Sequence, residues 1–108
     1  MFIALEVSIQ LVQSLRDLVP IIEQADRDLG DQVRRAASSV ILNLGEGQRL
    51  TKGNKQKHYV LAHGSANEVN VALAAAQAWG LIGEATEQRQ ILDRLLALLW
   101  RLTHPKRA

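Results

Sequence analysis

The residues of this chain best suited to bind a charged ligand lie in one short stretch near its middle. Arg49, Lys52, Lys55 and Lys57 supply four fixed positive charges there, and His58 adds a titratable group. Cations clustered at a turn and in the first turns of a helix attract phosphate, so this stretch is the candidate nucleic-acid-binding site. The alternative is a solvated, charged turn without a ligand. These cations oppose the helix dipole, and therefore they do not serve to stabilise the helix that follows.

The histidines and carboxylates do not form a catalytic or metal-binding pattern. His58 and His63 are five residues apart, about 140° around a helix, whereas two ligands of one metal ion require a spacing of three or four. The sequence Gly45-Glu46-Gly47 lacks the lysine and the preceding strand of a phosphate-binding loop. The Glu-x-x-His pairs of a two-metal carboxylate site are also missing. We therefore expect no enzyme activity, no catalytic residue, no metal and no cofactor.

Two carboxylates, Glu46 and Glu68, each fall in a short motif, Asn43-Leu44-Gly45-Glu46-Gly47 and Gly64-Ser65-Ala66-Asn67-Glu68. We expect both to have a structural role. The predicted partners of these carboxylates are Arg34, Arg35 or the amide groups at helix ends.

Charge is unevenly distributed along the sequence. The formal net charge is +2, but residues 1–33 carry two basic and six acidic side chains, whereas residues 34–63 carry six basic and one acidic. The basic excess is therefore local and surrounds one turn. Tyr59 is the only aromatic residue adjacent to it, so sequence-specific recognition of single-stranded nucleic acid is not expected.

Length and composition indicate one helical domain over residues 1–108. Hydrophobic residues make up 47% of the chain, aromatic residues only 4%, and there is no cysteine. An aliphatic, alanine-rich core suits closely packed helices better than a wide sheet, and no disulfide framework is possible. The N-terminus lacks a signal-peptide pattern, and no apolar run is long enough to span a membrane. We expect a cytoplasmic protein.

The spacing of apolar residues is helical throughout, and no run alternates as a strand would. Residues 20–30, which begin with a proline, are predicted to form a short helix whose join to the next one is left open by Gly30. Asp31 is expected to cap the second long helix, and Thr51 or Asn54 the third. These signals predict an all-α, antiparallel up-down four-helix bundle, with helices over residues 3–18, 31–46, 52–79 and 84–103.

One apolar stripe on each long helix is expected to face the core. Gly64 within the third helix costs about 1 kcal/mol relative to alanine, so we expect a compensating contact that needs no side chain there. Leu42 and Trp100 lie off the stripes, which predicts a second buried surface and hence an oligomer. The expected stripes are Leu5, Ile9, Val12 and Leu15, widened by Leu11 and Leu18; Val33, Ala36/Ala37, Val40/Ile41 and Leu44; Tyr59, Ala62, Ala66, Val69, Leu73 and Ala76; and Ile91, Leu92, Leu95, Leu96, Leu98, Leu99 and Leu102.

Two motifs make this chain resemble a known family. The first combines Gln32-Val33-Arg34-Arg35-Ala36 with Asn43-Leu44-Gly45-Glu46-Gly47, and the second is Tyr59 with Gly64-Ser65-Ala66-Asn67-Glu68 and, later, Gly80-Leu81-Ile82. Their order resembles the four helix bundle protein family, over about residues 5–103. That family includes proteins encoded in intervening sequences of bacterial 23S ribosomal RNA genes and accessory variability proteins of diversity-generating retroelements. Leu81 departs from the tyrosine often found there, and the stretch between Pro20 and Gln32 is longer than usual.

The resemblance implies a ring-like homo-oligomer of five subunits with an accessory or scaffolding role, beside a reverse transcriptase or a ribosomal component. Five copies of the basic stretch would place about 20 lysine and arginine charges in one ring. We therefore expect a non-enzymatic, oligomeric helical bundle that binds structured RNA or other nucleic acid through its backbone charge. A protein–protein adaptor without nucleic-acid binding is the alternative.

Overall fold

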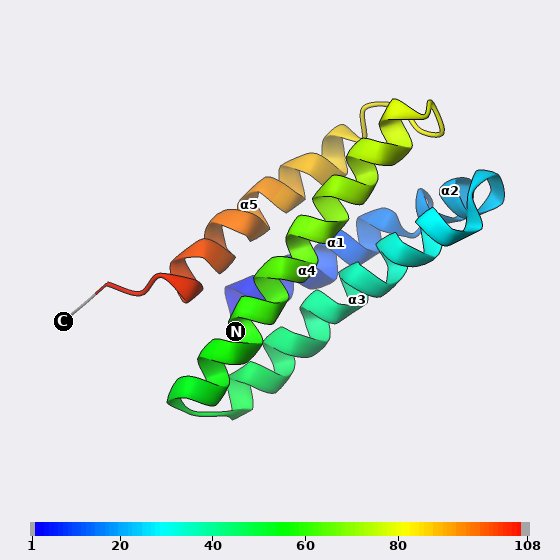
Figure 1. Cartoon of the computed structure of the whole chain (residues 1–108). Helices are drawn as coiled ribbons and strands as arrows, with labels where there is room; N and C mark the ends of the chain where they lie inside the picture. Colours follow the sequence, from blue (N-terminus) through cyan, green and yellow to red (C-terminus); the bar gives the residue numbers. More distant parts are fainter. Residues whose placement is uncertain (1, 107–108) are drawn as a thin grey trace.

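The computed structural model describes residues 2–106, and this part of the chain contains helices and their connections but no strand. The molecule is a rod with dimensions of 47 × 21 × 20 Å (Figure 1). The helix α3 packs against α1, α2 and α4, and α5 packs against α1 and α4. The predicted all-α class is confirmed. The five helices are α1 (Ile3–Leu15), α2 (Val19–Ala25), α3 (Arg27–Arg49), α4 (Lys52–Ala78) and α5 (Thr86–Thr103).

The first helix is shorter than predicted, and a separate short helix follows it. Helix α1 ends at Leu15 instead of residue 18, and the Leu18 N–H donates to the Leu15 carbonyl oxygen at 3.1 Å in the turn. Pro20 then lies in the first turn of α2, where a residue without an N–H loses no helical hydrogen bond.

Helix α3 begins earlier than predicted because its cap is Asp26 and not Asp31. The Asp26 carboxylate accepts a hydrogen bond from the Leu29 N–H at 3.0 Å, which satisfies one of the free amides at the helix start. Gly30 is therefore inside α3. A Cβ placed on Gly30 would lie 2.8 Å from both the Cα and the backbone nitrogen of Glu23, so α2 can approach α3 this closely only at a glycine.

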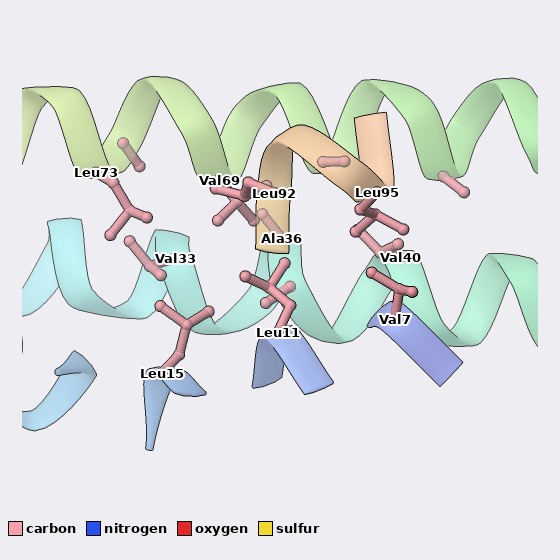
Figure 2. Packing of buried hydrophobic residues seen from close by; sticks show 14 of the residues in the cluster. Val7, Leu11, Leu15, Val33, Ala36, Val40, Val69, Leu73, Leu92 and Leu95 are labelled. Carbon is pink, nitrogen blue, oxygen red and sulfur yellow. The ribbon is translucent and has the colours of Figure 1, made fainter. Parts of the chain in front are cut away.

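The core lies where the apolar stripes of α3 and α4 predicted it, and side chains of α1 and α5 complete it (Figure 2). Val33, Val40 and Leu44 of α3 are fully buried, and so are Val69 and Leu73 of α4. From α5, the innermost leucines of the predicted stripe contribute fully buried side chains, namely Leu92, Leu95 and Leu99.

The side of α1 that is buried differs from the predicted side by a rotation of part of a turn about the helix axis. Ile9, which was expected in the core, is 39% exposed, whereas Val7 and Ser8 are buried. The Ser8 hydroxyl donates to the Leu5 carbonyl oxygen at 2.7 Å, so this polar group is satisfied inside the core. Apolar residues occur on more than one side of α1, and therefore periodicity alone does not select the buried side. The buried positions are Ala4, Val7, Ser8, Leu11 and Leu15.

The last connection follows the prediction closely. Gly80, with a φ of 76°, ends α4, and the N–H of Leu81 donates to the Ala76 carbonyl oxygen at 2.9 Å. Helix α5 begins at Thr86, two residues later than predicted. None of the helices within residues 2–106 has the length and apolar character required to cross a membrane.

Several large apolar side chains point away from the core. Leu42 is 70% exposed and Trp100 is 54% exposed, as their positions off the stripes predicted. Val71 of α4 is exposed as well. The contact expected at Gly64 is not made within the described chain, since a Cβ placed there would meet nothing within 4 Å. Its helix-propensity cost is therefore not offset inside the subunit.

Candidate nucleic-acid interface

The predicted basic stretch forms the connection between α3 and α4 at one end of the rod (Figure 1). Arg49 is the last residue of α3, Lys52 is the first residue of α4, and residues 50–51 join them. The Lys52 backbone has a φ of 46°, in the left-handed region. The first two turns of α4 carry the other three candidates, Lys55, Lys57 and His58.

The lysines surround the end of the rod and do not share one face of α4. At about 100° per residue, Lys52 and Lys55 are about 60° apart around the helix axis, but Lys57 is about 160° from Lys55. Lys52 and Lys57 are exposed, and Lys55 is half-buried. Such an arrangement suits a polyanion that lies across the end of the rod better than a small anion in a pocket.

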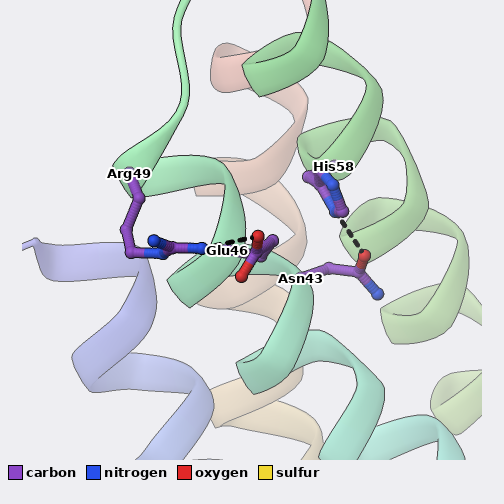
Figure 3. A network of polar contacts seen from close by, with 4 residues as sticks. All are labelled: Asn43, Glu46, Arg49 and His58. Carbon is purple, nitrogen blue, oxygen red and sulfur yellow. Dashed lines mark hydrogen bonds and ion pairs between the residues drawn. The ribbon is translucent and has the colours of Figure 1, made fainter.

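Within residues 2–106, one of the four fixed cations has an acidic partner. Arg49 Nη2 donates to Glu46 Oε1 at 2.8 Å, one helical turn earlier on α3 (Figure 3). None of the three lysines forms an ion pair with any of residues 2–106. Their charges are therefore not compensated by neighbouring carboxylates, although solvent and salt screen them.

His58 is held by α3 and is not free in solvent. Its Nδ1 lies 2.9 Å from Oδ1 of Asn43 (Figure 3). Because a carboxamide oxygen only accepts, Nδ1 carries the hydrogen. The hydrogen bond fixes the imidazole ring between the two helices, so His58 contributes to the α3–α4 contact.

Asn43 continues this contact into a chain of polar side chains between α3 and α4. Asn43 Nδ2 donates to the carbonyl oxygen and to Oγ of Ser39, each at 3.0 Å. Ser65 of α4 donates to the same Ser39 Oγ at 2.9 Å. In the sequence, Asn43 and Ser65 stood out only as members of motifs, and this polar contact between α3 and α4 was not predicted. The available signal was that asparagine is a poor helix former, which makes its place inside a helix unusual.

Gly47 explains why the first motif ends in glycine. A Cβ placed on Gly47 would lie 2.8 Å from Cε1 of Tyr59 and 3.2 Å from Cβ of His58, so the backbone of α3 serves as the packing surface for the start of α4. Tyr59 is buried, and Phe2 lies against it with a ring-centroid distance of 5.8 Å. Burial raises the pKa of the Tyr59 phenol. Tyr59 is therefore part of the core and is not available for stacking.

The fold brings further cations to this end from the last turn of α5. Gln56 Nε2 donates to the Thr103 carbonyl oxygen at 3.1 Å, and Thr103 Oγ1 lies 3.5 Å from Nδ1 of His63. These contacts place the end of α5 beside the start of α4. Arg101 and Lys106 are exposed in this region. Both lie far from residues 49–58 in the sequence, so the sequence alone did not indicate that they belong to the same basic end.

The two carboxylates expected to pair with Arg34 or Arg35 do not do so. Glu46 pairs with Arg49, and Glu68 lines a shallow hollow with Arg35 without an ion pair among residues 2–106. The partner of Arg34 is Glu23 of α2, at 2.8 Å. The hydrogen bond from the Arg34 guanidinium lowers the pKa of the Glu23 carboxyl and raises that of Arg34.

Potential metal ligands are not clustered in the part of the chain that the structure describes. Among residues 2–106, no group of three or more histidine and carboxylate side chains lies close enough together to hold a metal ion. One hollow of about 230 Å³ lies away from the basic end, with a largely apolar floor. Its lining consists of Val12, Leu15, Arg16, Val19, Arg34, Ala37 and Ser38.

Residues 2–102 match the family described as 23S rRNA-intervening sequence protein. The chain belongs to this family. No curated protein and no solved structure matches it.

The 23S rRNA-intervening sequence protein motifs have a clear place in this fold. Asn43 and Gly47 from the first motif, and Tyr59 and Ser65 from the second, meet at the contact between α3 and α4. These motif residues support the basic end, and Lys52 and Lys57 next to them are exposed at its surface.

Proposed function

We propose that this 23S rRNA-intervening sequence protein is a non-enzymatic, oligomeric helical protein whose basic end binds structured RNA through the phosphate backbone. The observation that carries the proposal is the group of three lysines at one end of the rod, which have no acidic partner among residues 2–106 and lie beside the exposed cations of the α5 end. Phosphate contacts supply affinity and position the ligand without reading bases. The family description, which names 23S rRNA, is compatible with an RNA-associated role.

The scaffold that presents this end is, in our interpretation, an antiparallel up-down four-helix bundle of α1, α3, α4 and α5. Support comes from the packing of α3 on α1 and α4, and of α5 on the same two helices. The short α2 is then an addition that packs on α3. A rigid bundle of this kind suits an accessory or scaffolding role, because it fixes the positions of the lysines.

Assembly of several copies would strengthen RNA binding. The outward sides of α3 and α4 expose Leu42, Val60, Leu61 and Val71, each by 47% or more of its surface. Exposed apolar residues of neighbouring helices favour a contact between copies of the chain. Five copies, the number implied by the family resemblance, would repeat the basic end five times and raise the local density of positive charge.

The test compares two variants of equal net charge. The first reverses the basic end with Lys52→Glu, Lys55→Glu and Lys57→Glu, which changes the formal net charge from +2 to −4. The matched control makes the same change of charge at exposed arginines away from that end, namely Arg16→Glu, Arg27→Glu and Arg94→Glu. A stem-loop RNA is the probe, and its affinity is measured over a range of salt concentrations.

We expect the lysine variant to lose RNA binding and the arginine variant to retain most of it, with both still folded. For the parent protein, log K should fall by about 0.7 to 0.9 per phosphate contacted for each tenfold rise in salt. The loss should be the same for stem-loops of unrelated sequence, because phosphate contacts do not depend on the base. Absence of RNA binding by the parent at low salt would end the proposal.

A protein–protein adaptor is the second candidate, and the exposed apolar side chains favour it. Leu42 and Val71 are 70% and 67% exposed on neighbouring helices, and either a second copy or another protein can cover them. The adaptor function becomes the better supported one if the lysine variant binds the stem-loop as tightly as the parent protein does.

A further inference from the structure

Trp100 and His104 form a stacked pair of rings on the outside of the last turn of α5. Their centroids are 4.2 Å apart and their planes are inclined by only 11°. The indole is 54% exposed, and His104 is exposed as well. Nδ1 of His104 lies 2.9 Å from the Trp100 carbonyl oxygen and 3.1 Å from Thr103 Oγ1. The imidazole is therefore held in place, and the pair presents an ordered aromatic surface to solvent.

The ring pair is adjacent to the basic end. The hydrogen bond from Gln56 to the Thr103 carbonyl oxygen joins the residue before His104 to the first turns of α4. Arg101 and Lys106 lie on either side of His104 in the sequence, and both are exposed. An aromatic surface and uncompensated cations thus occur together, although 40 or more residues separate Trp100 from the lysines in the sequence.

The second tryptophan of the chain lacks this setting. Trp79 is 78% exposed at the far end of α4, next to Gly80, and no ring from residues 2–106 is stacked on it. It lies at the opposite end of the helix from Lys52, so it is an exposed indole like Trp100 but is far from the basic end. Trp79 is therefore a control for Trp100 within the same molecule.

Proteins that hold single-stranded RNA combine cations that follow the backbone with aromatic rings on which bases stack. In a duplex the bases are stacked on one another, so an aromatic ring at the surface selects unpaired nucleotides. We propose that the Trp100–His104 pair stacks on an unpaired base of the RNA held at the basic end. This inference rests on the proposed RNA binding and specifies its substrate as a duplex flanked by unpaired nucleotides.

The experiment uses RNAs that differ only in the presence of bases. Two stem-loops share one stem, and one carries a short oligoadenosine 3′ extension while the other carries an abasic extension of the same length. Because both extensions have the same number of phosphates, charge contributes equally to their binding. The proteins compared are the parent chain, Trp100→Leu, Trp100→Phe and the control Trp79→Leu.

We expect the parent and Trp79→Leu to bind the adenosine extension about five- to 150-fold more tightly than the abasic one, which is the range for stacking of one base. Trp100→Leu should bind the two RNAs equally, and Trp100→Phe should recover part of the preference. In a Trp79→Phe background, where Trp100 is the only tryptophan, the adenosine extension should quench the indole fluorescence and the abasic one should not.

Two results would overturn the stacking platform while leaving the proposed function intact. One is a Trp100→Leu variant that keeps the full preference for adenosine, and the other is tight, salt-dependent binding by the parent without preference or quenching. A change in the mass of the assembly on Trp100→Leu would also count against the platform, because it would assign the indole to a contact between subunits. If the parent binds neither RNA at low salt, the proposed function itself fails.

Discussion

Gly47 on α3 lies directly against the ring of Tyr59 on α4, since a Cβ added to the glycine would be 2.8 Å from Cε1 and 3.0 Å from Cδ1. Gly47→Ala gains up to about 1 kcal/mol of helix propensity, but overpacking such a contact costs about 1–3 kcal/mol. We therefore expect Gly47→Ala to lower the free energy of unfolding, as measured by urea denaturation.

Gly45 is the matched control for this prediction, two residues earlier on the same helix. A Cβ placed there would meet nothing within 4 Å. Gly45→Ala should therefore raise the free energy of unfolding by about 0.5–1 kcal/mol. Equal stabilisation by both alanines would show that the Tyr59 ring moves aside without cost.

A pair of aspartate substitutions tests the orientation of α3. Val40 is fully buried, so Val40→Asp places an unpaired carboxylate in the core at a cost of several kcal/mol, out of a typical total of about 5–15 kcal/mol. Leu42→Asp, on the same helix, changes a side chain that is 70% exposed and should leave the subunit folded. Circular dichroism melts distinguish the two, and an unchanged melting temperature for Val40→Asp would contradict the structure.

The assembly state is a separate prediction. One chain has a mass of 12.0 kDa, and light scattering of the parent at micromolar concentration should give a multiple of this value, with five subunits expected from the resemblance. Leu42→Asp and Val71→Asp should reduce the mass without unfolding the chain, because both side chains are exposed in the single subunit. A parent mass of one chain would refute the oligomer.

The ion pair between Glu23 and Arg34 predicts a pH dependence of stability. The pKa of the Glu23 carboxyl is lower in the folded state than its ordinary value, so the carboxylate contributes stability above that ordinary value and loses it as the pH falls through the folded pKa. Glu23→Gln should therefore melt slightly below the parent at neutral pH. The difference should shrink as the pH falls below the ordinary glutamate pKa of about 4.3 and disappear below the lowered pKa of the folded state. A difference that persists there would assign the effect to packing against Gly30.

The parts of the fold that depend on the local spacing of apolar residues were predictable from the sequence. The stripes of α3 and α4 are buried as predicted, because each has small or apolar residues on one side at helical intervals. The side of α1 that enters the core was not predictable in this way, since Ile9 and Val7 are equally apolar. Gly30 left the join between the short helix and the next one open, because its role depends on the position of Glu23 in another helix.

The candidate site also has residues that could be predicted from the sequence and residues that could not. The lysines near the α3–α4 turn were evident from composition alone, whereas the partner of His58 was not, because Asn43 lies on a different helix. Trp100 was predicted to lie off the leucine stripe of its helix, but its place beside the basic end depends on the contact between Gln56 and Thr103, 47 residues apart. Contacts between residues that are distant in the sequence depend on how the helices pack, and the periodicity of apolar residues does not predict that packing.

The two ends of the rod differ in sign of charge. Five carboxylates lie at the corner of α1, α2 and α3 (Asp17, Glu23, Asp26, Asp28 and Asp31), where they outnumber the arginines (Arg16, Arg27, Arg34 and Arg35). The hydrogen bond from Gln88 to the Ser14 carbonyl oxygen places the start of α5 at this same end. The opposite end carries the uncompensated lysines. The molecule therefore has an electric dipole along an axis of 47 Å. Near a polyanion it experiences a torque that turns the basic end forward, so collisions occur in one orientation before any contact is made.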